Sequence, residues 1–289
     1  MKLRHPAILG IALVSLGLSA AKPSQTPSSS VSAFKYQADR ALTGTLLQYE
    51  KSNLDGSRVA RIYVYMPTPD RVEVLKVEPG SSVAALVKAD MDWSRFSAKT
   101  TDSFHVHKDG TLTPQATSEL DAAGVFTIRV GQGVFPATVR HLPVHNYNFD
   151  LTSLNLSLPF LVDPKAPVEV GIVEPNWARL LRPGFKMEGR QEGVFVYRGK
   201  VRLSYQGQDL IKERICRKYL VQGPGLSPGR GTLWVDAERG FMVAFEHPKT
   251  DNPSWSSFKF LLKQEKAIDA DDWNKLQQNV RAELPMEEQ

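Results

Sequence analysis

From Leu42 onward, short runs of β-branched and aromatic residues alternate with turn residues at the close spacing typical of an all-β fold. Polar and apolar positions alternate strictly in residues 200–205, so Val201, Leu203 and Tyr205 share one face of a half-buried strand. Comparable patterns predict strands near 42–51, 58–66, 71–78, 84–89, 103–108, 134–141, 168–174, 194–206, 210–222, 231–236, 241–247 and 256–264.

Local signals add turns and one helix to these strands. Asp-Gly pairs at 55–56 and 109–110 predict tight hairpins, because they supply the positive φ angles of two-residue turns. Near the end of the chain, an acidic opening at 269–272 precedes three apolar residues at helical spacing, Trp273, Leu276 and Val280. The pattern therefore predicts a mainly β fold, an antiparallel twisted sheet on which a short C-terminal helix at 269–282 packs.

The first residues have the form of an export signal. Two cationic residues are followed by about 12 apolar residues, fewer than the roughly 20 that span a bilayer, and then by small residues. We expect a signal peptide over 1–21, cleaved near Ala21, and hence a periplasmic or secreted protein with no transmembrane segment after cleavage. The Ser/Pro-rich stretch 22–32 predicts a flexible tether. We expect residues 33–289 to form a β-rich domain. The segment 143–167 is a candidate for an internal domain boundary.

Charge and cysteine content narrow the function classes. Loss of Lys2 and Arg4 with the signal lowers the formal charge from +5 to about +3, and the charges are interspersed along the chain. The absence of a basic block argues against a nucleic-acid partner. The single cysteine, Cys216, cannot form an internal disulfide, and its strand-like surroundings favour a buried side chain over a reactive thiol.

Motifs for catalysis or metal binding are weak. Residues 225–229 match G-x-S-x-G, but Pro228 has no N–H for an oxyanion, and the surrounding glycines and prolines indicate a loop between strands. His105 and His107 would face one side of a strand and are weak metal candidates, to which His141 and His145 could add ligands. We therefore predict no catalytic residues, no metal and no cofactor.

Two segments carry a family resemblance. The segments 42–46 (LTGTL) and 231–236 (GTLWVD), the latter followed by the turn 237–240, resemble hairpins of exported proteins with the periplasmic lipoprotein-carrier (LolA/LolB-like) fold. The resemblance covers about a third of the chain. It implies an open, unclosed barrel-like sheet around an apolar cavity.

The leading functional hypothesis is a non-catalytic envelope protein that binds a lipid, a lipidated protein or another apolar ligand in the concave face of the sheet. The resemblance to lipoprotein carriers implies a role in sorting outer-membrane lipoproteins. The residues expected to line that face are Ile62, Val64, Val201, Leu203, Tyr205, Phe241, Val243 and Phe245, with Trp234 at a rim. The same residues could instead form a packed core. The alternatives are a structural or assembly protein that contacts envelope partners, and an unrecognised periplasmic hydrolase.

Overall fold

The computed structural model describes residues 27–286, so the predicted signal peptide lies outside the described part of the chain. Of the described residues, about 51% are strand and about 15% helix, which confirms the mainly β prediction. No helix within 27–286 is long and apolar enough to span a membrane.

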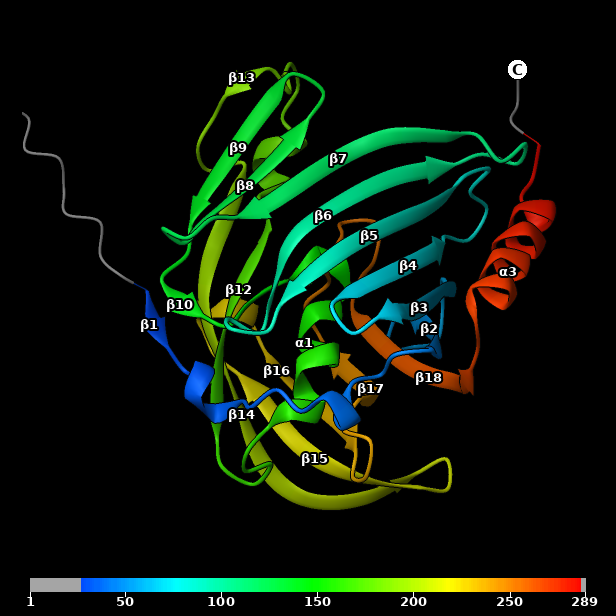
Figure 1. The fold of residues 1–289 in the computed structure, drawn as a ribbon. Coiled ribbons are helices and arrows are strands. Elements are labelled where there is room, and N and C mark those ends of the chain that lie inside the picture. The colour runs from blue at the N-terminus through cyan, green and yellow to red at the C-terminus, as the bar shows by residue number, and fades with distance from the viewer. Residues whose placement is uncertain (1–26, 287–289) are drawn as a thin grey trace, which may run out of the picture.

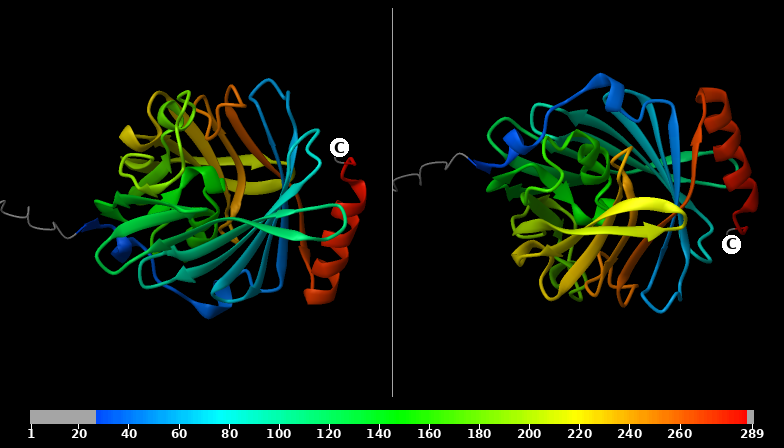
Figure 2. Two further views of the ribbon diagram at one scale, coloured as in Figure 1. Left: turned by 90° about the horizontal axis from the view of Figure 1, so that it is seen from above. Right: turned by 90° about the horizontal axis from the view of Figure 1, so that it is seen from below.

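One large sheet organises the molecule. Its hydrogen-bonded order is β11-β12-β14-β15-β16-β17-β18-β2-β3-β4-β5-β6-β7-β8-β9-β13, and only the outermost pairs, β11 with β12 and β9 with β13, are parallel. The sheet curves strongly without closing, as the sequence resemblance implied (Figures 1 and 2). Its strands are β2 (Thr45–Ser52), β3 (Ala60–Thr68), β4 (Arg71–Val77), β5 (Ala84–Asp92), β6 (Ser97–Val106), β7 (Leu112–Leu120), β8 (Val125–Val130), β9 (Gly133–Thr138), β11 (Val144–Asn146), β12 (Val168–Pro175), β13 (Gly189–Arg190), β14 (Phe195–Ile211), β15 (Arg214–Gln222), β16 (Arg230–Asp236), β17 (Met242–His247) and β18 (Phe258–Ala267).

The connecting segment between β11 and β12 lies inside the curve of the sheet (Figure 1). It contains η3 (Tyr147–Phe149), α1 (Thr152–Ser157) and η4 (Leu158–Phe160), and every residue of α1 is buried. Its leucines and aromatic rings join the main hydrophobic core, together with inward side chains of β12, β14–β18 and β2. The side chain of Asn155 ties the helix to the sheet, donating to Tyr49 Oη at 3.0 Å and accepting from the Met242 N–H at 2.7 Å.

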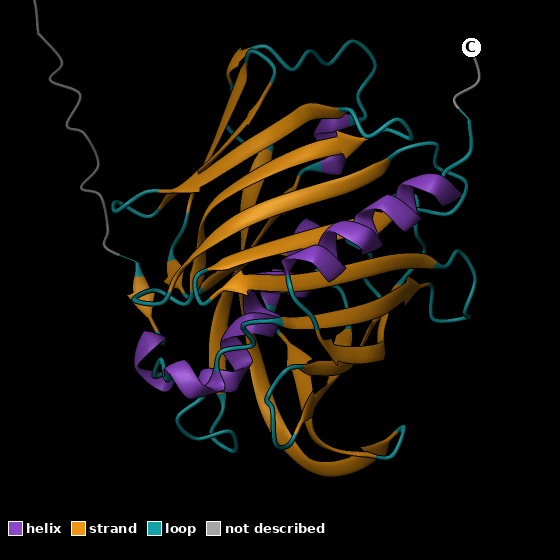
Figure 3. Cartoon of the chain, turned by 45° about the vertical axis from the view of Figure 1, so that its right-hand side comes forward, coloured by secondary structure: helices purple, strands orange, loops and turns teal. Residues whose placement is uncertain are grey.

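The C-terminal helix α3 (Ala270–Glu283) packs on the opposite, convex face (Figure 3). Trp273, Val280 and Leu284 bury against a second apolar cluster that includes Tyr63, Tyr65 and Leu86 of β3 and β5. The Asp269 side chain caps the helix by accepting from the Asp272 N–H at 2.9 Å. The prediction of a sheet-packed helix behind an acidic start is confirmed.

Three segments differ from the sequence pattern or add to it. β7 and β8 had no predicted strand; β7 is polar and mostly exposed, whereas β8 has an alternating pattern of buried residues that the sequence analysis did not assign. In the segment expected to be a tether, β1 (Ser28–Ser29) pairs with β10 (His141–Leu142), held by Ser28 N–H to Arg140 O at 3.0 Å. Strands from both sides of 143–167 belong to the same sheet.

Two more helical turns, η1 (Val31–Ala33) and η2 (Ala38–Arg40), precede β2, and α2 (Trp177–Leu180) and η5 (Pro224–Leu226) lie in later loops.

Candidate functional site

The concave face holds a cavity of about 240 Å³ beside η3, and no residue of α1 lines it. Its walls come from β2–β8, the first residue of β14, η3 and the loop at 251–252. The lining is mixed, with small apolar residues and hydroxyls on β5–β8 and charged residues near β2 and β4. Its side chains are Lys51, Ala60, Ile62, Lys76, Glu78, Ala85, Val87, Thr101, Ser103, Gln115, Ala116, Thr117, Ser118, Ile128, Asn146, Asn148, Phe149, Asp150, Phe195, Asp251 and Asn252.

The strand register explains why the cavity lies here. One row of side chains crosses the concave face through Tyr219, Leu233, Phe245 and Phe260, and then reaches Lys51 on β2. The row beside it passes through Leu262, Tyr49 and Ile62 to Lys76 on β4, and continues to Ala85 on β5. Both rows therefore change from large apolar residues to a lysine. Small side chains beyond the lysines leave space that α1 does not fill.

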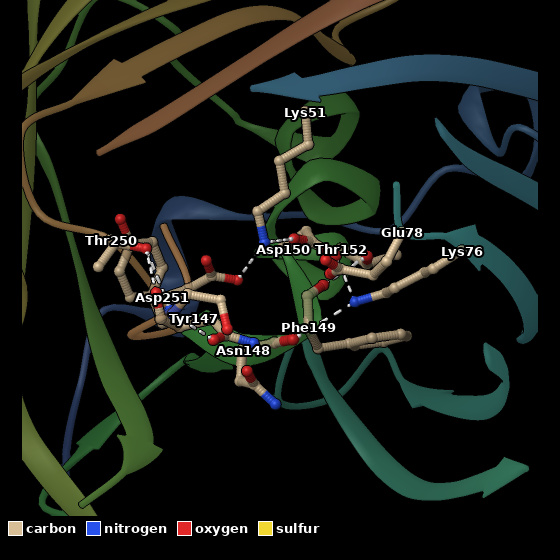
Figure 4. Close-up of polar contacts among 12 residues, drawn as sticks. Lys51, Lys76, Glu78, Tyr147, Asn148, Phe149, Asp150, Thr152, Thr250 and Asp251 are labelled. Carbon is tan, nitrogen blue, oxygen red and sulfur yellow. Dashed lines mark hydrogen bonds and ion pairs between the residues drawn. The ribbon is translucent and has the colours of Figure 1, made fainter. Parts of the chain in front are cut away.

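Lys51 and Lys76 belong to a buried ionic cluster with Asp150 and Asp251 (Figure 4). Lys51 Nζ lies 3.1 Å from Asp150 Oδ1 and 2.7 Å from Asp251 Oδ2, and the three side chains are at most 5% exposed. Lys76 Nζ pairs with Asp150 Oδ2 and donates to the Asn148 carbonyl at 3.3 Å. Asp150 thus bridges two lysines that come from different strands.

Aromatic rings surround the same ammonium groups. Lys51 Nζ lies 5.1 Å from the centroid of Trp255 and 5.2 Å from that of Phe258, and Lys76 Nζ lies 5.4 Å from that of Phe149. Cation–π attraction adds to the ion pairs in a place with little water. Both lysines are therefore held firmly at the cavity wall.

Burial and pairing move the acids of the cluster in opposite directions. Burial alone would raise the pKa of Asp150, but Lys51 and Lys76 outweigh it and hold that pKa below its ordinary value. Burial raises the pKa of Asp251 to about 6; the charge of Asp150 adds to this, and Lys51 offsets only part of it. The pKa of Lys51 lies above its ordinary value because its two carboxylates outweigh its burial. Asp251 is the least compensated member of the cluster.

The backbone is strained at the same point. Asp150 and Leu151 both have positive φ, 50° and 52°, in the left-handed region that β-carbon sterics disfavour. Such residues cost of order 1–3 kcal/mol each and persist where the surroundings fix them, often at functional sites. Here the carboxylate of Asp150 is held by two lysines, and the Leu151 side chain is buried in the main core.

Most of the predicted lining residues occupy a different part of the concave face, whereas Trp234 alternates with the inward Leu233 and contacts Lys218 on the other face. Seven of the nine are at most 2% exposed within the main core, and two are half-buried against it. Only Ile62 among them also lines the cavity. The seven are Ile62, Val64, Val201, Leu203, Phe241, Val243 and Phe245, and the two half-buried residues are Tyr205 and Trp234.

The histidines are not brought together. His107 Nε2 lies 2.9 Å from Thr113 Oγ1, and the two nitrogens of His141 contact Ser28 Oγ and the Glu169 carbonyl. His145 contacts Ser153, on α1. Over residues 27–286, no group of three or more His, Cys, Asp or Glu side chains is arranged to hold a metal ion.

Side chains with nucleophilic potential are poorly placed for catalysis. The G-x-S-x-G match lies in the loop between β15 and β16, as expected. Cys216 is buried, and burial raises the pKa of its thiol to about 11. Ser153 Oγ lies 2.8 Å from His145 Nδ1, but both residues are at most 2% exposed, and burial lowers the pKa of His145 to about 3. A substrate could not reach this pair without opening of the core.

The sequence analysis missed the ionic cluster, although one signal for it was present. Leu47, Tyr49 and Lys51 follow the period of two along one predicted strand, so Lys51 continues an apolar, inward face. Val72, Val74 and Lys76 do the same on the next strand but one. A lysine at such a position requires a buried partner. Asp150 and Asp251 lie in irregular segments, where no periodicity identifies them.

Comparisons with known proteins are limited to distant structural likenesses. No family model matches the chain, and no curated protein matches it in sequence. Solved structures with similarity include a β-barrel-like protein of a domain of unknown function (DUF1849) from Brucella abortus, at 7% identity and a TM-score of 0.37, covering 78% of this chain and 98% of that one.

Two further structures are similar to this chain. An outer membrane lipoprotein-sorting protein domain from Vibrio parahaemolyticus shares 10% identity at a TM-score of 0.28, covering 84% of this chain and 94% of that one. An exported protein with a YmcC-like fold from Bacteroides fragilis shares 13% identity at a TM-score of 0.25, covering 81% and 99%. The descriptions of these two structures are in line with the fold-level resemblance to lipoprotein carriers noted in the sequence. Likenesses of this degree do not assign a function.

Proposed function

We propose that this chain is an exported, non-catalytic envelope protein that binds an amphipathic ligand, such as a lipid or the acyl chain of a lipidated protein, in the cavity beside η3. The observation that carries the proposal is the cavity itself, because it lies on the concave face beside the packed core that the α1 leucines join. A pocket with an apolar wall and a few fixed polar groups is the usual form of a small-molecule site. The predicted export signal supports an envelope location.

Two neighbouring residues on β6 allow a matched test. Ser103 lines the cavity, whereas Asp102 is exposed on the other face of the strand. Native mass spectrometry and lipid extraction of the mature protein, isolated from the envelope, should detect a bound amphiphile. Ser103→Trp should fill the cavity and abolish that binding, while Asp102→Trp should retain it. Equal retention by both folded variants would contradict the proposed site.

A second candidate, an assembly protein of the envelope, is favoured by one surface feature. At the tip of the β14–β15 hairpin, Leu210 and Ile215 face each other across the strands and are 70% and 60% exposed. The pair offers a small apolar contact surface at the hairpin tip, which an envelope partner could enlarge. Double substitution of both residues to Ser should abolish cross-links to an envelope partner under this alternative, and leave ligand binding in the cavity unchanged.

A further inference from the structure

The cavity lining has more acidic than basic side chains. Among the described residues that line it, the ionisable groups are two lysines and three acids, Lys51, Lys76, Glu78, Asp150 and Asp251. When all five are charged, the lining carries one excess negative charge. Arg58 lies 3.8 Å from Glu78 at the rim and does not line the cavity, so a ligand head that enters this end meets a lining with one excess carboxylate.

Both ammonium groups are already engaged by the protein. Lys51 donates to Asp150 and Asp251 and is enclosed by Trp255 and Phe258. Lys76 pairs with Asp150 and donates to a backbone carbonyl. A carboxylate or phosphate head would have to displace one of these buried carboxylates from its lysine. Breaking a buried ion pair is costly, so the lysines are poorly suited to bind an anion.

Two of the acids, Asp251 and Glu78, can in contrast still accept hydrogen bonds from a ligand. Asp251 is 2% exposed, and its Oδ1 has no hydrogen-bond partner among the residues that the structure describes. Glu78 lies at the cavity rim with a side chain 41% exposed, and among the described residues its ion pair with Arg58 is a long one, at 3.8 Å. A buried acceptor without a partner is unfavourable, and a donor from a ligand would relieve that cost.

The opposite end of the cavity is uncharged. The β5–β8 residues that line it are small or apolar residues, hydroxyls and the amide of Gln115, and the apolar ones include Val87, Ala116 and Ile128. Thr101 and Ser118 satisfy each other across β6 and β7 at 2.7 Å, so these hydroxyls need no ligand. The cavity thus has an acidic end and a weakly polar end that suits a hydrocarbon chain.

We propose that the ligand is an amphiphile with a cationic, N–H-donating head, such as a primary ammonium, which binds at Asp251 while Glu78 adds negative charge at the rim and the chain lies along β5–β8. This inference rests on the proposed function and specifies its ligand class. Charge-assisted hydrogen bonds to the carboxylates favour such a head. The same carboxylates repel anionic heads, which gives selectivity by exclusion.

Three single-chain amphiphiles of equal length provide the test, namely dodecylamine, dodecanol and dodecanoate, measured by calorimetry with the full mature protein at neutral pH. We expect dodecylamine to bind about tenfold or more tightly than the other two, as loss of a charged hydrogen bond would imply. Asp251→Asn should remove most of that preference. Asp102→Asn, which makes the same charge change on the exposed face of β6, should leave it intact.

A second variant protects the test against misfolding of Asp251→Asn. Glu78→Gln changes a partly exposed rim residue and should weaken dodecylamine binding several-fold without affecting dodecanol. Equal or tighter binding of dodecanoate by the wild-type protein would overturn the cationic-head inference and leave cavity binding standing. Absence of binding by all three probes, with no amphiphile in the isolated protein, would overturn both.

Discussion

The concave face of this sheet is filled on one side and open on the other, and the difference lies in the inward side chains. Across β14–β18 they are large and apolar, including Leu203, Tyr219 and Phe245, and they pack against the leucines of α1. Across β5–β8 they are small or hydroxylated, including Ala85, Ser103 and Ala116, and a cavity remains. One sheet thus supplies a rigid core and a site, because residue size changes along its rows while the backbone geometry continues.

The ionic cluster lies at the boundary between these two regions. Lys51 continues the row that begins with Tyr219 and Phe245, yet its ammonium faces Asp150 and Asp251 at the cavity wall. The cluster therefore closes the apolar core on one side and supplies the charged end of the cavity on the other. This contrast can be tested from the largest expected effect to the smallest.

Truncation should be costly in the filled region and nearly neutral in the open one. Phe245→Ala removes a side chain that is 2% exposed in the main core, and should lower the free energy of unfolding by about 3–5 kcal/mol. Ser103→Ala, on the cavity wall, should change it by about 1 kcal/mol or less, through loss of one hydrogen bond to the Ala116 carbonyl. Urea titrations of the two variants measure the difference, and similar losses would contradict a distinction between the regions.

Removal of the central lysine should be nearly as costly. Lys51→Met leaves two buried carboxylates without their shared partner, and should destabilise the protein by about 3–5 kcal/mol at neutral pH. Lys263→Met is the matched control, since it removes a lysine paired with Glu50 at 2.7 Å on the surface. The control should lose at most about 1 kcal/mol. A Lys51→Met variant as stable as the control would show that the ionic cluster does not stabilise the boundary between the packed core and the cavity.

The cluster should also give the protein a distinctive dependence on pH. The folded pKa of Asp251 is raised to about 6, above the unfolded value of about 3.9, so the folded state binds the extra proton between these values. Stability should therefore fall as pH rises from about 4 to 6 and level off above. Lys51, Lys76, Asp150 and Tyr147 are the charged or titratable groups that act on this site.

Asp150 should act in the opposite direction at lower pH. Its folded pKa is depressed, so its contribution is present above the unfolded pKa and is lost as pH falls through the folded value. Thermal melts from pH 3 to 8 should show the Asp251 contribution disappear in Asp251→Asn, while the acid loss from Asp150 persists. An unchanged profile between about pH 4 and 6 in that variant would contradict the assignment.

Much of the fold followed from the sequence because alternation reports burial directly. Twelve strands and α3 were predicted near their observed positions, and the acidic start of α3 proved to be a helix cap. β7 escaped prediction because its residues are mainly exposed and polar. The leucines of 151–158 form a helix that is buried on all sides, so tertiary packing, and not an amphipathic pattern, determines it.

The site was harder to predict than the fold. Alternation placed Leu203 and Phe245 on an inward face correctly, but periodicity does not say whether an inward residue meets another side chain or a cavity. That depends on where α1 ends over the sheet, which is a long-range property. Lys51 was detectable as a charged residue on an apolar face, whereas its partners Asp150 and Asp251 come from segments about a hundred residues apart.

Cysteine accessibility tests the contrast between the two regions most directly. Ser103→Cys and Leu203→Cys place one thiol in the open region and one in the filled region, and native Cys216 is buried with a thiol pKa raised to about 11. We predict that a small thiol reagent modifies Ser103→Cys in the folded protein, that dodecylamine slows this reaction, and that Leu203→Cys reacts only on unfolding. Equal reaction rates at the two positions, or no protection of Ser103→Cys by the amphiphile, would contradict the account.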